Sequence, residues 1–243
     1  LASHERTRRQ WVADISHELR TPIALMRAEL EAVQDGIRQL DKCTVDALHG
    51  DVGRLSRLVD DLHEVALTDL GGMSFHFECV SLAQYVKADV AALQTSFDEA
   101  GLEISAHVDP GVATNVNGDP GRLSQLVRNV LGNALRYTHS PGKIEVRVLP
   151  ADNDGNVSLI IEDSAPGVPD ASLERLFDRL YRVDISRNRA AGGAGLGLAI
   201  CANIANGHGG TITASHSPLG GIRITVVLPH AGPDAPLGGP SPR

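Results

Sequence analysis

The sequence predicts a hairpin of two long amphipathic helices followed by an α/β sandwich. Within the first 70 residues, apolar side chains recur with the spacing of packed helices, and beyond them alternating strand patterns mix with helical ones. At 243 residues the chain is long enough for two cores of unequal size. We therefore expect a first unit over residues 1–70, a second over residues 74–230, and a disordered Gly- and Pro-rich tail over residues 231–243.

The helical prediction rests on two runs of apolar residues separated by gaps of three and four. They are Ile15, Leu19, Ile23, Met26, Leu30, Val33, Ile37 and Leu40, and then Val45, Leu48, Val52, Leu55, Val59, Leu62 and Ala66. The short link at residues 41–44 makes the two helices antiparallel. Each helix presents an apolar stripe that two helices alone cannot cover, so we expect a homodimer that forms a four-helix bundle. A monomeric hairpin packed on the rest of the chain is the alternative.

The second unit begins where the heptad spacing stops, at Gly71 and Gly72. A turn-rich stretch, residues 151–156, separates two alternating segments and predicts a strand hairpin. Helices interleave before and after it, which is typical of an α/β sandwich. The expected strands lie near residues 102–108, 144–148, 157–161 and 222–226.

Composition excludes several classes of function. A formal net charge of −8 and an aromatic content of 3% argue against nucleic-acid binding, which needs basic surfaces and stacking rings. Cys43, Cys79 and Cys201 are far apart and lack C-x-x-C spacing, so neither a disulfide framework nor a zinc site is indicated and a reducing cytoplasm is favoured. No stretch approaches the ~20 apolar residues of a membrane span. The opening HERTRRQ reads as a helix already under way, so we expect any membrane attachment to lie in an absent N-terminal region.

His17 is a candidate nucleophile on the first helix. It lies two residues from each of the seam positions Ile15 and Leu19, so a helical projection turns its imidazole away from the hairpin core. An exposed imidazole, with an ordinary pKa of about 6.5, is largely neutral and keeps one ring nitrogen free. Glu18 can orient the other ring proton, and Pro22 should bend the helix just past His17. A plain surface histidine is the alternative; a zinc-protease site is excluded because H-E-x-x-H is incomplete.

A second helix carries candidate ligands on one face. Asp119 as N-cap and Pro120 at the first helical position mark its start. Asn129, Asn133 and Arg136 follow at i, i+4 and i+7, so two amides and a guanidinium project together. Amide oxygens suit Mg²⁺, and arginine neutralises phosphate oxygens. The alternative is an ordinary solvated polar face.

Two further segments could contact a nucleotide. Asp163 follows an apolar strand and precedes a Pro/Gly turn, where a carboxylate can accept a hydrogen bond from an amine such as that of adenine, although aspartate at a strand end is also common turn chemistry. Later, closely spaced glycines enter a helix and let backbone N–H groups approach phosphate oxygens. Their spacing is neither that of a Walker motif nor that of a Rossmann fingerprint. This segment, which fits a lid over a triphosphate, contains Arg179, Arg182, Arg187, Arg189, Gly192, Gly193, Gly195 and Gly197.

Five segments in this order resemble the H, N, G1, F and G2 boxes of sensor histidine kinases: ISHELRTP, LVRNVLGNALRYT, EDSAPGVP, LFDRLYRVD and GGAGLGLAI. The first helix is similar to that of a group of envelope-stress sensors. The resemblance implies a dimerising four-helix bundle followed by a Bergerat-type (GHKL) ATP-binding α/β sandwich. It also implies ATP and Mg²⁺ as cofactors, a cognate response regulator as partner, and a place as the cytoplasmic portion of a bacterial inner-membrane protein.

The resemblance also implies roles for individual residues. His17 matches the phosphoacceptor, Glu18 the acidic neighbour that assists proton transfer, and Thr21 the position linked to dephosphorylation of the regulator. Asn129 and Asn133 match the two asparagines that coordinate Mg²⁺. The full set implied to bind the nucleotide is Asn129, Asn133, Arg136 and Tyr137, then Asp163 for the adenine amine, Gly167, Arg182, and the lid residues Gly193, Gly195, Leu196 and Gly197.

The sequence departs from the usual family pattern at Ala165, Leu180 and Ala194. Ala165 replaces a glycine and would weaken nucleotide binding if that turn required a positive φ or a close approach to adenine. Two rival functions differ in class. ATP-hydrolysing relatives place a water-activating Glu where this chain has Asn129, which favours transfer to a side chain over hydrolysis. A degenerate dimeric scaffold would bind its partner without catalysing phosphorylation. Measuring whether the chain binds ATP at all distinguishes such a scaffold from a kinase.

Overall fold

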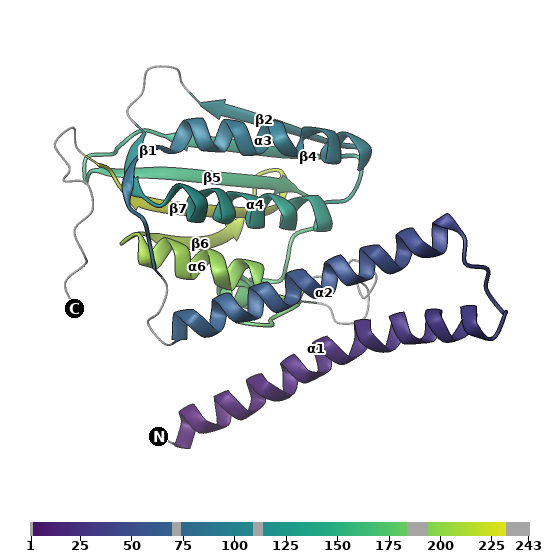
Figure 1. Ribbon diagram of the computed structural model, residues 1–243. Helices are drawn as coiled ribbons and strands as arrows, with labels where there is room; N and C mark the ends of the chain where they lie inside the picture. The colour runs from purple at the N-terminus through teal and green to yellow at the C-terminus, as the bar shows by residue number, and fades with distance from the viewer. Residues whose placement is uncertain (1, 70–73, 109–113, 184–193, 232–243) are drawn as a thin grey trace.

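The computed structural model describes residues 2–69, 74–108, 114–183 and 194–231 of the chain. Within these ranges, the side chains of residues 2–14, 17, 18 and 67–69 are not described. The chain forms a helical hairpin and an α/β sandwich, with the hairpin extending to one side of the sandwich (Figure 1). The predicted fold class is thus confirmed at the level of a hairpin followed by a sandwich.

The hairpin consists of α1 (Ala2–Gln34) and α2 (Lys42–Asp69). The first helix ends earlier than predicted, because Gly36 adopts a φ of +71° and its amide donates to the Val33 carbonyl. The amide of Ile37 donates to the carbonyl of Ala32, which completes a Schellman cap. The predicted seam positions Ile37 and Leu40 therefore lie between the two helices, and both side chains are exposed.

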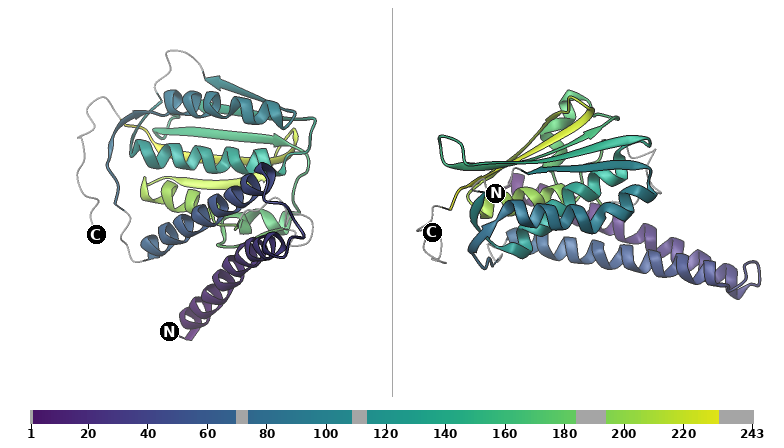
Figure 2. Two further views of the ribbon diagram at one scale, coloured as in Figure 1. Left: turned by 45° about the vertical axis from the view of Figure 1, so that its right-hand side comes forward. Right: turned by 90° about the horizontal axis from the view of Figure 1, so that it is seen from above.

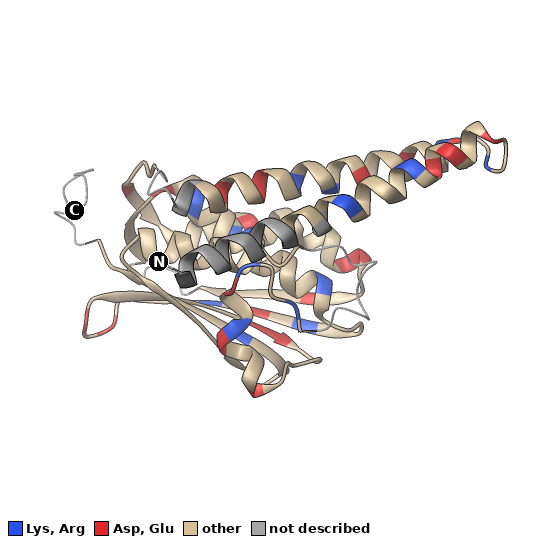
Figure 3. Ribbon diagram, turned by 90° about the horizontal axis from the view of Figure 1, so that it is seen from below, with Lys and Arg blue, Asp and Glu red and all other residues tan. Residues whose placement is uncertain are grey.

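Local sequence features explain where α2 starts and how α1 runs past Pro22. The carboxylate of Asp41 accepts the amide hydrogen of Thr44 at 2.8 Å and caps the start of α2. The first helix, α1, is continuous through Pro22, and its axis changes direction along its length in Figure 1. Charged residues of both signs are spread along the described parts of both helices (Figure 3), as expected for helices with a solvent face.

The main sheet has five strands in the order β2-β4-β5-β7-β6. The two strands β2 (Leu102–Val108) and β4 (Gly142–Leu149) are parallel, and the remaining pairs are antiparallel. The predicted strand hairpin is confirmed, since β4 pairs with β5 (Asn156–Ser164). The other main strands are β7 (Gly220–Pro229) and β6 (Thr211–His216), and a separate two-stranded sheet joins β1 (Glu78–Ser81) to β3 (Asn115–Gly118).

Three helices form the second layer of the sandwich: α3 (Leu82–Glu99), α4 (Pro120–Tyr137) and α6 (Gly197–Gly207). Figure 2 shows the strands in one layer and these helices in another. A short helix α5 (Asp170–Leu173) and a 3-10 turn η1 (Glu174–Phe177) follow β5. Between the layers lie the largest fully buried apolar side chains, among them Phe97, Leu82, Leu123, Leu126, Leu131, Ile144, Leu159, Leu196, Ile200, Ile204 and Leu228.

The sandwich includes Ala231, the residue at which we placed the start of the tail. Ala231 is buried and its amide donates to the carbonyl of Asn115 at 2.8 Å, while His230 forms a bridge with Val116. The predicted disorder of the tail concerns residues 232–243, which lie outside the described residues. Among the helices in the described ranges, none has the length and hydropathy needed to cross a membrane.

Candidate functional site

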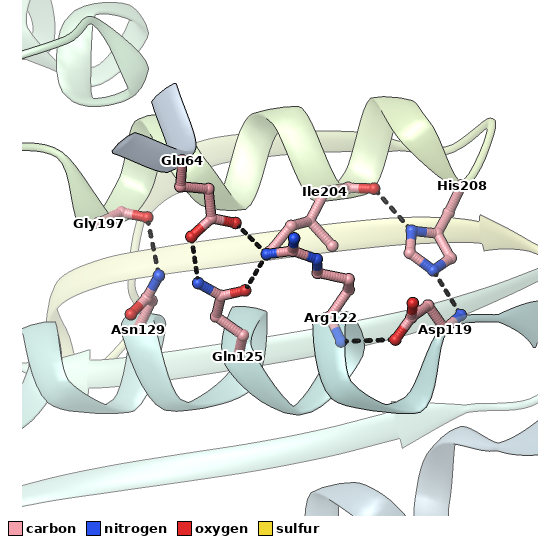
Figure 4. A network of polar contacts seen from close by, with 8 residues as sticks. All are labelled: Glu64, Asp119, Arg122, Gln125, Asn129, Gly197, Ile204 and His208. Atoms are coloured by element: carbon pink, nitrogen blue, oxygen red, sulfur yellow. Dashed lines mark hydrogen bonds and ion pairs between the residues drawn. The ribbon is translucent and has the colours of Figure 1, made fainter. Parts of the chain in front are cut away.

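Helix α4 is held at its first residue by a buried polar network (Figure 4). The carboxylate of Asp119 accepts the amide hydrogens of Arg122 at 3.0 Å and of His76 at 2.8 Å. Burial acts to raise the pKa of Asp119, but these amide hydrogen bonds outweigh it, and the pKa lies below its usual value. The Asp119 amide in turn donates to Nε2 of His208 at 2.9 Å. The start of α4 is therefore tied to the end of α6.

His208 is a neutral imidazole in this network. Because Nε2 accepts the Asp119 amide hydrogen, Nδ1 carries the ring proton and donates to the Ile204 carbonyl at 2.7 Å. Burial lowers the pKa of His208, in keeping with this tautomer. The rings of Phe75 and Phe77 pack edge-on against it.

The polar stripe predicted on α4 faces the first turn of α6. The Asn129 amide nitrogen donates to the Gly197 carbonyl at 3.4 Å, which leaves its amide oxygen directed away from that carbonyl (Figure 4). Asn133 and Arg136 follow on the same face of the helix. The side chain of Tyr137, the last residue of α4, is partly buried. Asn129 and Asn133 thus offer two amide oxygens on one helix face, a donor set that fits Mg²⁺.

A small open pocket lies beside this stripe, between α4, the ends of β5 and β7, and α6. It brings Asn133 together with Asp163, the candidate for reading an amine. Its walls are otherwise apolar and are formed by Val130, Ala134, Ile161, Leu198, Ile222 and Ile224. Apolar walls with a few polar groups are typical of sites for small molecules. The sequence prediction missed Leu198 and Ile222, because nothing in their local patterns distinguishes them from other core residues.

Asp163 is fixed by the backbone of the neighbouring strand. Its carboxylate accepts the amide hydrogen of Ile222 at 2.7 Å. Burial raises the pKa of Asp163 to about 6, although the Ile222 hydrogen bond opposes the shift. A Cβ at Gly221 would lie 2.0 Å from the Asp163 Oδ1 atom, so this position requires a glycine. The sequence prediction missed Gly221, although the pair Gly220-Gly221 at the start of a strand was a visible signal.

The turn after Asp163 accommodates Ala165. Among the described residues, the non-glycine residue with a positive φ is Leu180, so Ala165 does not need the left-handed conformation that favours glycine. The carbonyl of Ala165 accepts the amide hydrogen of His139 at 3.0 Å. Gly167 packs closely against the β6–β7 turn, where a Cβ would lie 3.3 Å from the Gly220 carbonyl oxygen. Ala165 is thus compatible with the backbone conformation of this turn.

Gly195 connects the predicted lid to the segment that resembles the F box. Its φ is +70°, and a Cβ there would lie 2.8 Å from the Tyr181 carbonyl oxygen. The carbonyl of Gly195 accepts the amide hydrogen of Leu180 at 2.9 Å. The structure therefore gives Gly195 a packing role at the base of the lid. Of the lid residues implied to contact phosphate, Gly193 lies outside the described residues, as do Arg187, Arg189 and Gly192.

The remaining lid positions surround the N-terminus of α6. Leu196 is the N-cap and its side chain is buried in the core. The first amides of an α-helix have no intrahelical acceptor and favour an anion, and α6 starts at Gly197. Arg182 is partly buried and lies just before the gap at residues 184–193.

His17, Glu18 and Thr21 lie on α1, away from the α4 stripe. The structure describes the helical backbone at His17 and Glu18 but not their side chains, whereas the side chain of Thr21 is exposed. Helix α1 packs on α2, and α2 packs on α6. The structure thus brings Asn133 and Asp163 together in one pocket, with Asn129 one turn earlier on α4, while the helix that carries His17 packs on α2.

Comparison with known proteins identifies both units. Residues 7–71 match the family "His Kinase A (phospho-acceptor) domain", and residues 118–232 match "Histidine kinase-, DNA gyrase B-, and HSP90-like ATPase". The chain is 46% identical over 229 residues to the signal transduction histidine-protein kinase BaeS of Escherichia coli K12, covering 94% of this chain and 48% of that protein. It is 30% identical to the sensor histidine kinase WalK of Bacillus subtilis, covering 93% of this chain and 37% of that protein. The chain thus spans about half of these relatives' length or less.

Solved structures share the fold. The Acinetobacter baumannii histidine kinase AdeS superimposes with a TM-score of 0.73 at 27% identity, over 89% of this chain and 98% of that chain. The histidine kinase ThkA, solved in complex with the response regulator protein TrrA, superimposes with a TM-score of 0.73 at 20% identity, over 95% of this chain and 66% of that chain. With a phospho-acceptor hairpin and an ATPase-type sandwich in one chain, this protein belongs to the histidine kinase family.

Proposed function

We propose that this chain is the catalytic part of a sensor histidine kinase that uses ATP and Mg²⁺ to phosphorylate His17 and then passes the phosphoryl group to an aspartate of a response regulator. The observation that carries the proposal is the pocket that joins Asn133 to Asp163, set beside Asn129 and the open amides at the start of α6. These groups match the polar edge, the metal and the phosphates of a Mg-nucleotide.

Each part of the site has a separate task. The carboxylate of Asp163 accepts a hydrogen bond from the adenine amine, and the apolar walls exclude water from the ring. The amide oxygens of Asn129 and Asn133 would hold Mg²⁺, which would neutralise phosphate charge when bound. Arg136 and the first-turn amides of α6 orient the phosphate oxygens, so that positioning and charge stabilisation supply most of the rate.

The chemical step joins a ring nitrogen of His17 to the γ-phosphorus of ATP. The bond between this phosphorus and the bridging oxygen breaks, and ADP leaves with the electron pair of that bond. Glu18 takes up the proton that the phosphorylated ring releases. With Asn129 at the position of the hydrolytic Glu of related ATPases, the site lacks that water-activating base, which favours transfer to His17.

The partners follow from the same proposal. A response regulator receives the phosphoryl group, and Thr21, whose side chain is exposed, orients the water that later dephosphorylates it. A second copy of the chain covers apolar side chains that the hairpin leaves exposed, among them Ile23, Leu30, Val45, Val52 and Val59. We further propose that residues 1–70 and 74–230 act as separate domains, and that the chain is the cytoplasmic portion of a bacterial inner-membrane protein.

Incubation with γ-labelled ATP and Mg²⁺ tests the phosphoacceptor. The wild-type chain should acquire acid-labile, alkali-stable label, and His17→Gln should acquire none. His63→Gln, at an exposed histidine of α2, is the matched control and should be labelled like the wild type. Label that persists in His17→Gln would exclude His17 as the acceptor. An unlabelled wild type that still binds ATP would favour the scaffold instead.

Titration calorimetry of ATP binding, with and without Mg²⁺, tests the metal site. Replacing Asn129 and Asn133 together with alanine should weaken ATP binding by about tenfold or more in Mg²⁺, and much less in EDTA. Asn206→Ala, at an exposed asparagine at the other end of α6, should leave both affinities unchanged. Equal losses with and without Mg²⁺ would show that the two amides do not hold the metal.

A further inference from the structure

A polar contact joins the hairpin to the sandwich at Glu64. Its carboxylate accepts hydrogen bonds from Arg122 Nη1 and Gln125 Nε2, both at 2.5 Å, and Arg122 also donates to the Gln125 side-chain oxygen at 3.0 Å (Figure 4). Glu64 is 9% exposed. Both oxygens of a nearly buried carboxylate are thus satisfied by two side chains of α4.

Apolar side chains of α2 surround this contact. Leu58 and Val65 are buried and belong to the core cluster, and Leu62 packs against that cluster. They lie at i, i+4 and i+7, on a different face of α2 from the exposed Val52 and Val59. One face of α2 therefore docks on the sandwich, and another remains open for a second copy.

Arg122 and Gln125, which bind Glu64, lie in the same row along α4 as the proposed nucleotide ligands. Arg122, Gln125, Asn129 and Arg136 are spaced by three, four and seven residues, so they lie along one side of α4. The positive charge of Arg136 acts to lower the pKa of Asp61 on α2, so the two side chains lie within electrostatic range. The second helix, α2, covers the N-terminal half of the stripe and places a carboxylate near its C-terminal half.

We propose that Glu64, Arg122 and Gln125 form an interdomain latch that holds the sandwich on α2 and restrains phosphorylation of His17. The inference rests on the proposed function, in which the nucleotide must reach His17 on α1, the helix that packs on α2. While the latch is closed, the sandwich is held in one position against α2, and its nucleotide is kept away from His17. Opening the latch frees the sandwich to carry its nucleotide to His17.

Two cysteines of the chain allow docking to be measured. Cys43 at the start of α2 and Cys79 in β1 are exposed, one in each unit. Cys201 is buried, and burial raises the pKa of its thiol, so it does not compete for a label. Nitroxides on Cys43 and Cys79, in a chain diluted with unlabelled copies, report the intrachain distance by double electron–electron resonance.

Charge reversal tests the latch. Glu64→Arg and Arg122→Glu should each broaden a single narrow distance distribution and raise the rate of His17 labelling roughly tenfold, which corresponds to about 1.4 kcal/mol. The double variant, which restores the pair, should recover both wild-type values. Asp51→Asn removes an ion pair with Arg54 within the same helix and should change neither.

The two readouts separate the possible failures. Wild-type distances in both single variants would overturn the latch. A broadened distance with an unchanged labelling rate and unchanged ATP affinity would overturn the restraint. If the wild type itself acquires no label, the proposed function fails, while the distance measurement still decides whether Glu64 holds the two units together.

Discussion

At the scale of single residues, the pocket depends on positions where a side chain cannot be added. Gly221 allows the carboxylate of Asp163 to reach the amide of Ile222, and Gly195 allows the lid base to pack on the backbone of residues 180–181. A carboxylate with a pKa of about 6 remains mostly ionised near pH 7, so Asp163 acts as a hydrogen-bond acceptor.

Replacing Gly221 with alanine tests this fit. The new Cβ would lie 2.0 Å from Asp163 Oδ1 and 2.4 Å from the Ser164 carbonyl oxygen, so the carboxylate must move. We expect a loss of about 2 kcal/mol of stability and weaker nucleotide binding, measured by thermal unfolding and calorimetry. Gly132→Ala on α4, where a Cβ meets nothing within 4 Å, should stabilise the helix instead. Equal behaviour of the two variants would contradict the steric argument.

At the scale of elements, α4 is positioned from its N-cap. The helix presents buried leucines and valines to the core, Asn133 to the pocket and Asn129 to the start of α6, so a shift at Asp119 would move the whole stripe. His208 supports that cap from the end of α6 by accepting the Asp119 amide hydrogen. The geometry of the site thus depends on the neutral imidazole of His208, at the C-terminal end of α6.

The histidine makes the cap sensitive to acid. Because burial lowers the pKa of His208, the folded chain binds this proton less well than the unfolded chain. The stability it contributes is present above pH ~6.5 and is lost as the pH falls below that value, by at most about 1.4 kcal/mol per pH unit. Asp61 and Asp163, whose pKa values burial raises to about 6, act in the opposite direction.

Chemical unfolding of the wild type and His208→Gln between pH 8 and pH 5 isolates this effect, because Asp61 and Asp163 are common to both proteins. The difference in the free energy of unfolding should shrink as the pH falls. His139→Gln, at an exposed histidine, controls for the loss of an imidazole as such. A difference that stays constant across this range would show that His208 is not buried in its neutral form.

At the scale of the whole molecule, the hairpin has one surface that packs on the sandwich and another that stays exposed. One face of α2 docks on the sandwich through Leu58, Glu64 and Val65, and another leaves Val52 and Val59 exposed. Exposed apolar residues at heptad spacing on a hairpin favour a four-helix bundle with a second copy. Docking and the proposed dimerisation therefore use different sides of one helix and can change independently.

Val52→Glu tests the dimer. The side chain of Val52 is 52% exposed in the single chain, so a charge there should leave the fold intact but disfavour a buried seam. Sedimentation equilibrium should give twice the chain mass for the wild type and a mass near that of one chain for the variant. Leu149→Glu, at an exposed apolar residue of the sheet, should remain dimeric. A wild type with the mass of one chain would contradict the bundle.

Local patterns in the sequence were sufficient for the features that depend on nearby residues. Heptad spacing predicted the hairpin, Asp119 and Pro120 predicted the start of α4, and alternation predicted the β4–β5 hairpin. The spacing of Asn129, Asn133 and Arg136 placed them on one helix face. Periodicity reports burial and orientation along one element, and these conclusions need nothing more.

Only the tertiary structure decided which distant residues meet. Periodicity does not identify the partner of a buried face, so it could not predict that Leu58 and Val65 of α2 join the core cluster of the sandwich. It also could not pair Glu64 with Arg122, or require a glycine at 221 against Asp163. The short strands β1 and β3 and the polar strand β6 were missed because pairing with neighbouring strands, rather than local apolar alternation, defines them. Contacts of this kind depend on the packing of whole elements, and the local sequence does not encode them.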